Sequence, residues 1–404
     1  MKILPIDTYN QPYAIVMAAF LLARRPKILL QLPSIDRLML GWLAVLGCLM
    51  LLVQLPDGLV LRELMFLLSY LTPLLLIPVT LYTLRKDIEF SRRILSYGIF
   101  IWVGVGLVQR LVDPSFLGFL VSVGESELGL NLVNSGRGVL SLAPEPTHFG
   151  FHMIALGATL IAIGGPAWIA FLAIFSSIFL ALSTSALAAL AIGFFIWMLV
   201  RLRRWPVILI IAVVSSGMFQ LAAATFDDST RIGHLIRSVG TMGFDIFLSD
   251  FSVNSRFYGF YAPIRESVFN LFAPIGISVQ SWGELSAKIM SFDPNIMFLS
   301  LNGPASGFGL LLVQGGFFAL PVLVYFFHRM CVRPSYSWRG VFACAAFAVF
   351  LGQIYLATPS FSLLFASLIY GYQNGFGGHR TRIFSRLHNG GASLSGGNPK
   401  VGAA

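Results

Sequence analysis

The segment APEPTHFGFH, residues 143–152, carries the polar side chains whose types and spacing best suit chemistry. Glu145 stands between two prolines, and His148 and His152 follow three and seven positions later, so a helix would carry all three on one face. Such a face could supply a general base or bind a sugar. Two other interpretations stay open. Glu145 could simply cap a helix that starts at Pro146, and two histidines with one carboxylate could form a metal site, which is the weaker alternative.

Four arginines could bind an anionic ligand near this segment. Arg137 lies eight residues before the glutamate beside a glycine, Arg256 is flanked by aromatic residues, and Arg265 follows nine residues later. Arg110 ends an apolar stretch, directly after Gln109. A guanidinium offers paired donors that suit phosphate. The alternatives are a salt bridge for Arg265 with a nearby acid and, for Gln109 and Arg110, polar side chains reaching from an apolar stretch toward water.

Motifs of soluble enzymes are absent from the sequence. There is no GxxxxGK[ST], HExxH or CxxC, and no GxGxxG between a strand and a helix. The three cysteines stand in apolar runs or beside a basic segment, which favours small buried side chains over a disulfide or a metal site. We therefore expect no metal and no cofactor.

Composition shows which solvent surrounds these residues. Of 404 residues only 11% are charged, against roughly 25% in soluble domains, while 57% are hydrophobic and the mean hydropathy is +0.82. A soluble fold cannot bury so much apolar surface, so lipid must surround most of the chain. This excludes a soluble enzyme, a nucleic-acid-binding domain and a disordered chain. The net charge of +10 is better explained by basic loops that fix membrane topology.

Hydropathy predicts an all-α polytopic membrane protein with about eleven transmembrane helices, within a range of ten to twelve. The predicted spans are residues 6–23, 38–55, 60–84, 94–112, 147–164, 167–183, 184–200, 206–225, 305–327, 340–357 and 360–373.

The basic residues orient this arrangement. If the spans alternate, most of them fall on one side: Arg24, Arg25, Lys27, Arg37, Arg85, Lys86, Arg92, Arg93, Arg201, Arg203, Arg204, Arg329, Arg333, Arg339, Arg380, Arg382, Arg386 and Lys400. The positive-inside rule makes that side the cytoplasm. The N-terminus is then external and the C-terminus cytoplasmic.

The chain divides into four regions. Residues 1–225 hold the first eight spans with an external loop at about 113–146, and residues 226–304 form a large external loop. That loop is too apolar for a solvated linker, so we expect short helices on the membrane surface. Residues 305–373 hold spans nine to eleven. Residues 374–404, rich in Gly, Ser, Arg and Asn, predict a disordered cytoplasmic tail.

Four segments, taken in order, resemble the Wzy-type polysaccharide polymerases and the related O-antigen ligases. RGVLSLAPEPTHFGFH, residues 137–152, is similar to the family's arginine followed by Glu-Pro-Ser at the entry to a central span, with Thr147 in place of Ser. FLALSTSALAALAIGFF, residues 179–195, is similar to the family's Leu-Thr-x-Ser helix.

The third segment lies within the long predicted external loop, and the fourth follows it. SRFYGFYAPIRESVFNLFAPIGIS, residues 255–278, resembles the family's Ser-Arg, apolar helix and glycine-containing turn, in which Arg256 and Gly276 match and Ser278 replaces the second glycine. GPASGFGLLLVQGGFFALPVLVYFF, residues 303–327, is similar to the Gly-rich span that comes next.

Two departures favour polymerase over ligase. Ligases of this family carry an arginine directly after the Ser of the second segment, where Ala186 stands here. They also carry a His-Asn pair before the late Gly-rich span, where this chain has Asn302 and no histidine.

The resemblance implies a GT-C-like glycosyltransferase that needs neither nucleotide sugar nor metal and acts at the external face of the bacterial inner membrane. The substrates would be oligosaccharide repeat units linked to undecaprenyl diphosphate within the membrane lipid, for O-antigen or exopolysaccharide biosynthesis. Glu145, His148 and Arg256 would be catalytic, and Arg137, Arg265, His152 and Arg110 would bind diphosphate or sugar. A chain-length regulator and a flippase of the same pathway are possible partners.

Two alternatives remain at this point. One is the ligase, which transfers a finished glycan to an acceptor. The other is a transporter of lipid-linked sugars, although a transporter should carry ionisable residues or broken helices near the membrane midplane.

Overall fold

The structure, a computed structural model, describes residues 13–54, 61–120, 138–202, 251–297, 299, 303, 306–334, 339–352 and 356–374. The predicted span 206–225, Arg137, Asn302 and the tail from residue 375 lie outside these ranges. The described part is all-α, with thirteen α-helices. They are α1 Tyr13–Arg24, α2 Ser34–Gln54, α3 Leu61–Lys86, α4 Ile88–Leu111, α6 Pro146–Ala162, α7 Ala167–Phe179, α8 Thr184–Leu202, α12 Phe251–Phe269, α13 Val279–Phe292, α14 Gly307–Gly315, α15 Leu320–Phe327, α16 Gly340–Gly352 and α17 Pro359–Gln373.

Four helical stretches are long and apolar enough to cross a membrane, which indicates a multi-pass membrane protein. They are Ser34–Leu52, Phe66–Lys86, Ile88–Leu111 and the run Gly307–Val332. Large apolar side chains on the outside of the molecule, such as Leu38, Leu49 and Ile101, are about half exposed or more. Side chains of this kind on two of the candidate spans are suited to lipid rather than water.

Each predicted span except 206–225 overlaps a helix or a run of helices, and residues 6–12 of the first span also lie outside the described ranges. Two differences from the predicted spans have a clear structural cause. The helix predicted over 94–112 begins earlier, at Ile88, because the Asp87 carboxylate accepts a hydrogen bond from the Phe90 N–H at 2.9 Å and caps it. The span predicted over 305–327 is interrupted at Gly316, which has φ +51° and lies where a Cβ would come 2.2 Å from the Phe272 carbonyl oxygen. The close approach of another segment therefore breaks this helix.

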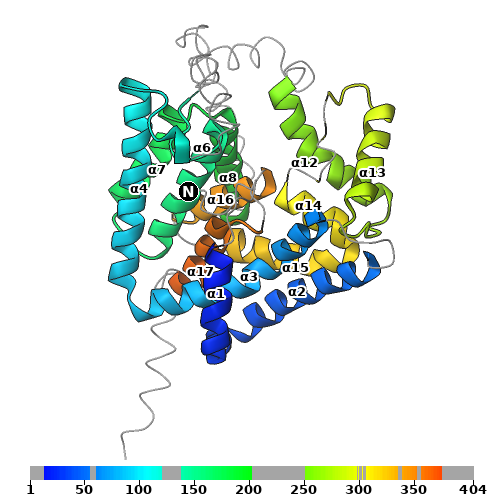
Figure 1. Cartoon of the computed structure of the whole chain (residues 1–404), viewed down its shortest axis with the longest axis horizontal. Coiled ribbons are helices and arrows are strands. Elements are labelled where there is room, and N and C mark those ends of the chain that lie inside the picture. Colours follow the sequence, from blue (N-terminus) through cyan, green and yellow to red (C-terminus); the bar gives the residue numbers. More distant parts are fainter. Residues whose placement is uncertain are drawn as a thin grey trace, which may run out of the picture.

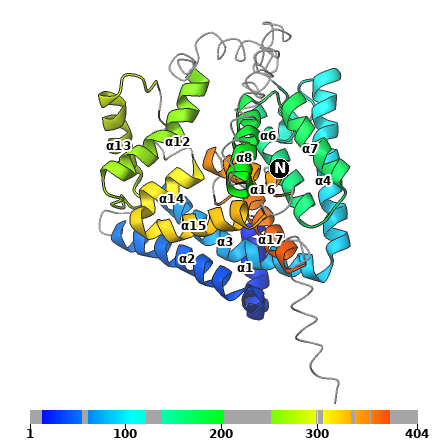
Figure 2. The same ribbon diagram turned by 180° about the vertical axis from the view of Figure 1, so that it is seen from behind.

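The helices form two groups joined by α16. Helices α4, α6, α7 and α8 stand together on one side, α12 and α13 lie on the other, and α2, α3 and α15 run along the base (Figures 1 and 2). Helix α16 packs on α8 and α6 as well as on α14 and α12. Its contact with α8 depends on Gly193, where a Cβ would lie 2.2 Å from the Ala345 Cα, so the two backbones touch.

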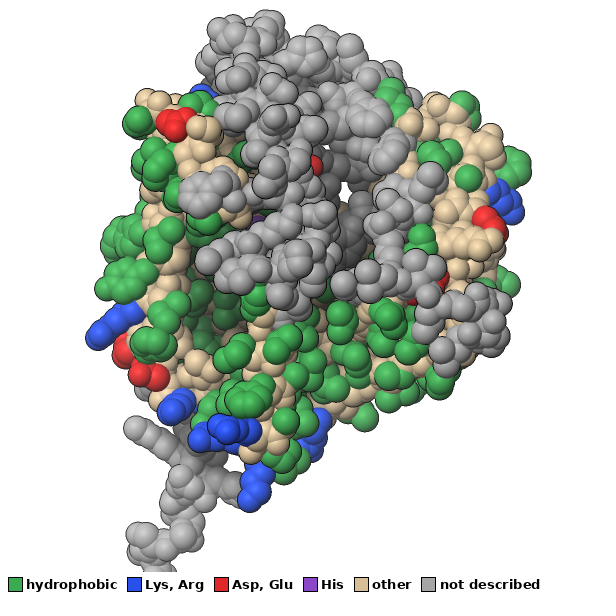
Figure 3. All heavy atoms as spheres, in the orientation of Figure 1, with side chains coloured by type: hydrophobic (Ala, Val, Ile, Leu, Met, Phe, Trp, Pro, Cys, Tyr) green, Lys and Arg blue, Asp and Glu red, His purple; other side chains and the backbone are tan. Residues whose placement is uncertain are grey.

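Basic segments that the charge pattern places on one side lie together in the structure. The Arg25 guanidinium donates to the Tyr82 hydroxyl at 2.8 Å, and Arg85 donates to the Gln31 carbonyl at 2.9 Å and to the Gln373 side chain at 2.6 Å. Figure 3 shows a group of Lys and Arg side chains at the lower end of the molecule, below a largely hydrophobic body. Three connections distant in sequence thus share one basic end.

Candidate functional site

Glu145 occupies the N-cap position of α6 without using its side chain as a cap. Its backbone is extended (φ −139°, ψ 153°), its carbonyl accepts the Phe149 N–H at 3.1 Å, and its side chain makes no capping hydrogen bond. Within the described part of the chain the half-buried carboxylate has no hydrogen-bond or ion-pair partner.

His148 and His152 follow Glu145 on the same helix, as the spacing predicts. Both are half-buried, and the His152 ring lies 5.5 Å from the Trp102 ring of α4, centroid to centroid. Trp102 also stacks on Phe149 at 5.9 Å. This places His152 in the aromatic contact between α4 and α6, whereas His148 lies one helical turn closer to Glu145. Among the described residues no group of three or more His, Cys, Asp or Glu side chains could hold a metal ion.

Gln109 of α4 holds the chain that leads into Glu145. Its amide nitrogen donates to the carbonyls of Phe116, at 2.9 Å, and Ser141, at 3.0 Å, and its amide oxygen accepts the Ser141 N–H at 2.6 Å. The Ser141 hydroxyl also donates to the Trp102 carbonyl at 2.6 Å. These bonds fix Ser141 at φ +52°, a conformation that few residues other than glycine adopt. Gln109 is thus a positioning residue. The alternative interpretation, in which its side chain reaches toward water, does not predict these hydrogen bonds to the backbone.

The first and second family-like segments lie side by side. The Val139 N–H donates to the Leu180 carbonyl at 2.9 Å, and Gly138 packs so closely that a Cβ there would lie 2.0 Å from the Ala181 carbonyl oxygen. Only glycine permits this approach. The contact therefore fixes Gly138 and Val139 beside the turn between α7 and α8.

The place where ligases of the family carry arginine is closed in this chain. Ser183 caps α8 by accepting the Ala186 N–H at 3.2 Å, and Ala186 is fully buried. A Cβ on Gly150 of α6 would lie 2.9 Å from the Ala186 Cβ. An arginine side chain would therefore have no room between α6 and α8.

Arg256 lies in α12, in the second group of helices; its side chain is outside the described part. Two residues earlier, Asn254 is buried and ties α12 to the chain after α13. Its amide donates to the Asn295 carbonyl at 2.7 Å, and its oxygen accepts the Met297 N–H at 2.9 Å. Pro263 of the same helix packs on Gly309 of α14. The backbone that carries Arg256 is therefore fixed from two directions.

Arg265 forms ion pairs with protein carboxylates. Its guanidinium contacts Asp293 at 2.9 Å and Glu266 at 3.2 Å. Partial burial alone would lower the pKa of Arg265, but the hydrogen bonds to Asp293 and Glu266 outweigh it and raise that pKa. Arg265 therefore forms a salt bridge, as one of the two interpretations expects, and its contact with Asp293 joins α12 to the end of α13. Arg110, by contrast, is exposed and has no described partner.

The third and fourth family-like segments also pack together. The N–H groups of Ile275 and Gly276 donate to the carbonyls of Val313, at 3.1 Å, and Gln314, at 3.2 Å. Gly276 has φ +76°, which explains a glycine at this turn. Buried Glu63 accepts the Val279 N–H at 3.2 Å. In the sequence, the only signal for contacts of this kind is the presence of polar residues at the ends of apolar stretches.

The site therefore has two parts. Helix α6 carries Glu145, His148 and His152, while α12 carries Arg256 and Arg265, and α16 is packed against both helices.

Comparison with known proteins adds no relative. No family model matches the chain, and neither the curated proteins nor the solved structures give a match.

Proposed function

We propose that this chain is a polysaccharide polymerase, a glycosyltransferase that joins undecaprenyl-diphosphate-linked repeat units at the external face of the bacterial inner membrane. The N-terminus would be external and the basic end cytoplasmic. The observation that carries the proposal is the contact at Gly138, which sets the first two family-like segments side by side. The same segment leads to Glu145, whose carboxylate has no partner among the described residues. The closed position at Ala186 supports polymerase rather than ligase.

In the proposed reaction an acceptor hydroxyl attacks the anomeric carbon of the donor glycan. The new bond joins the acceptor oxygen to that carbon, and the bond from the carbon to the phosphate oxygen breaks, so the lipid diphosphate leaves with the electron pair. Glu145 takes the hydroxyl proton, and His148 holds the acceptor sugar or shares the proton. This assignment uses a feature of Glu145 that a capping role does not explain, namely a half-buried carboxylate with no partner in the described ranges.

The leaving diphosphate needs cationic partners. Arg256 and Arg137 fit this role because guanidinium groups stabilise phosphate charge by paired hydrogen bonds. Arg265 is already paired with Asp293 and Glu266, so we assign it the positioning of α12 and α13. His152, in contact with Trp102, orients α6. Arg110 is left as a surface residue that could bind the sugar.

A complementation assay tests this proposal. A strain lacking the gene would carry wild type, Glu145→Gln or Arg256→Gln, and polysaccharide length would be read on a gel with membrane levels checked by blotting. Glu284→Gln is the matched control, because Glu284 is an exposed carboxylate whose one described hydrogen bond is with Gln280 on the same helix. We expect single repeat units from both site variants and long chains from the control.

Other outcomes have defined meanings. Long chains that remain on the carrier lipid in the deletion strain would indicate the ligase. Full complementation by Glu145→Gln would show that the catalytic assignment is wrong.

A further inference from the structure

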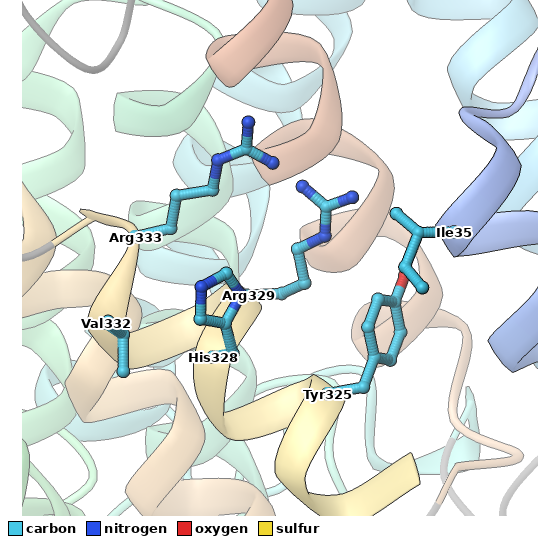
Figure 4. A pocket seen from close by; sticks show the side chains of 6 residues that line it. All are labelled: Ile35, Tyr325, His328, Arg329, Val332 and Arg333. Carbon is cyan, nitrogen blue, oxygen red and sulfur yellow. The ribbon is translucent and has the colours of Figure 1, made fainter. Parts of the chain in front are cut away.

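A pocket of about 390 Å³ lies at the basic end of the molecule, apart from the proposed catalytic site (Figure 4). It is formed where the run α14–α15 ends in a π-helical turn, His328–Val332, next to the start of α2. Its lining residues are Ile35, Tyr325, His328, Arg329, Val332 and Arg333.

The π-helical turn brings two arginines to the same side of the pocket. The Arg333 N–H donates to the His328 carbonyl at 2.9 Å, five residues back, which is the widened bonding of a π-helix. In Figure 4 the side chains of Arg329 and Arg333 extend in the same direction from this turn. Single π-turns of this kind are frequent at functional sites because they redirect side chains.

Only one of the two arginines is neutralised. Arg329 is buried in an ion pair with Asp36, which also accepts a hydrogen bond from the Tyr325 hydroxyl at 2.5 Å. Arg333 lies over the Tyr372 ring at 4.9 Å and has no acidic partner in the described ranges. His328 is exposed at the same pocket. The pocket therefore carries a net positive charge beside one fixed carboxylate.

The charges at the pocket set the charge of a suitable ligand. The Asp36 carboxylate is buried and its charge is matched by Arg329. Among the lining residues this leaves the charge of Arg333, which matches a ligand with a single negative charge. Ile35, Val332 and the Tyr325 ring supply an apolar wall beside the charged groups.

We propose that this pocket binds a singly charged phosphodiester, independently of the proposed glycosyl transfer. Basic pockets between transmembrane helices on the cytoplasmic side bind the phosphates of lipid head groups, and the pocket has that character. The same chemistry could come from a phospholipid in the inner leaflet or from a water-soluble phosphodiester. Arg333 contacts the phosphate, His328 donates to it, and the Asp36–Arg329 pair keeps the turn in place.

Lipid binding to the full chain in detergent tests this proposal. The probes are phosphatidylglycerol, diacylglycerol with the same acyl chains, and glycerophosphoglycerol, and dissociation constants come from native mass spectrometry. We expect phosphatidylglycerol to bind at least tenfold more tightly than diacylglycerol. Arg333→Gln should weaken its binding about tenfold, as loss of a charge-assisted hydrogen bond does. Arg93→Gln, which removes an exposed charge from the same basic end, should leave it unchanged.

The remaining outcomes show whether the phosphodiester is a lipid or a soluble molecule, and which results contradict the proposal. Equal affinity for glycerophosphoglycerol and phosphatidylglycerol would support the site with a soluble ligand. Equal affinity for phosphatidylglycerol and diacylglycerol, or equal losses in the Arg333 and Arg93 variants, would overturn the proposal. If Arg333→Gln does not fold, His328→Gln changes an exposed side chain of the same pocket and should weaken binding severalfold.

Discussion

Replacement of Gly138 by alanine should separate the two segments that build the proposed catalytic site. A Cβ at this position would lie 2.0 Å from the Ala181 carbonyl oxygen and 2.5 Å from that of Leu180. A normal carbon–oxygen contact is about 3.3 Å or longer, so the chain must retreat by roughly 1 Å or more. Overpacking of this kind costs about 1–3 kcal/mol, and loss of the bond between Val139 and Leu180 costs about 0.5–1.5 kcal/mol. We expect a total loss of stability of about 1.5–4.5 kcal/mol.

Thermal unfolding of the detergent-purified protein measures this loss, and polysaccharide length in cells measures activity. A displacement of about 1 Å at Glu145 could reduce the rate on the order of a hundredfold, so activity should fall even at temperatures where the variant stays folded. Gly104→Ala on α4 is the matched control, because a Cβ there meets no atom within 4 Å. If both variants unfold at the same temperature, the backbone contact at Gly138 does not exist and the reasoning fails.

Three further substitutions test other contacts by thermal unfolding. Asp36→Asn should cost about 3–5 kcal/mol because it leaves Arg329 buried without a counter-charge, and combining Asp36→Leu with Arg329→Met should recover most of the loss. Gln109→Leu should cost about 2–4 kcal/mol by leaving buried backbone groups unpaired, and should speed proteolysis within 113–146; unchanged proteolysis would contradict the positioning role. Gly193→Ala should cost about 1–3 kcal/mol by forcing α8 away from Ala345, so a neutral effect would argue against that packing.

Hydropathy predicts where the helices lie because apolar stretches bounded by polar residues must form helices in lipid. The adjoining spans 167–183 and 184–200 show where such reasoning is weakest, since the intervening turn is itself apolar. Between α7 and α8 the backbone turns at Leu182, which has φ +43°, and Ser183 then caps α8. The interruption at Gly316 is harder still, because it depends on a segment more than forty residues earlier in the chain, at Phe272.

The candidate site was predictable along one helix but not between helices. The spacing of Glu145, His148 and His152 fixes their common face, since helical geometry depends on local sequence alone. The partners of Arg265 and Gln109 depend on tertiary contacts, so residue type by itself cannot separate a ligand-binding side chain from one that holds the fold.

The exposed face of α12 constrains how a lipid-linked substrate would reach the proposed site. Phe257 and Tyr261 are each about 40% exposed and stack at 5.5 Å, and Phe269 at the end of the helix is 73% exposed. Aromatic side chains of this kind are favourable at the boundary between lipid and water. Since Arg256 lies beside Phe257 in sequence, a carrier lipid lying along this face would bring its diphosphate to the level of Arg256. A glycan attached to that diphosphate would then extend toward the water, which is where an acceptor sugar must come from.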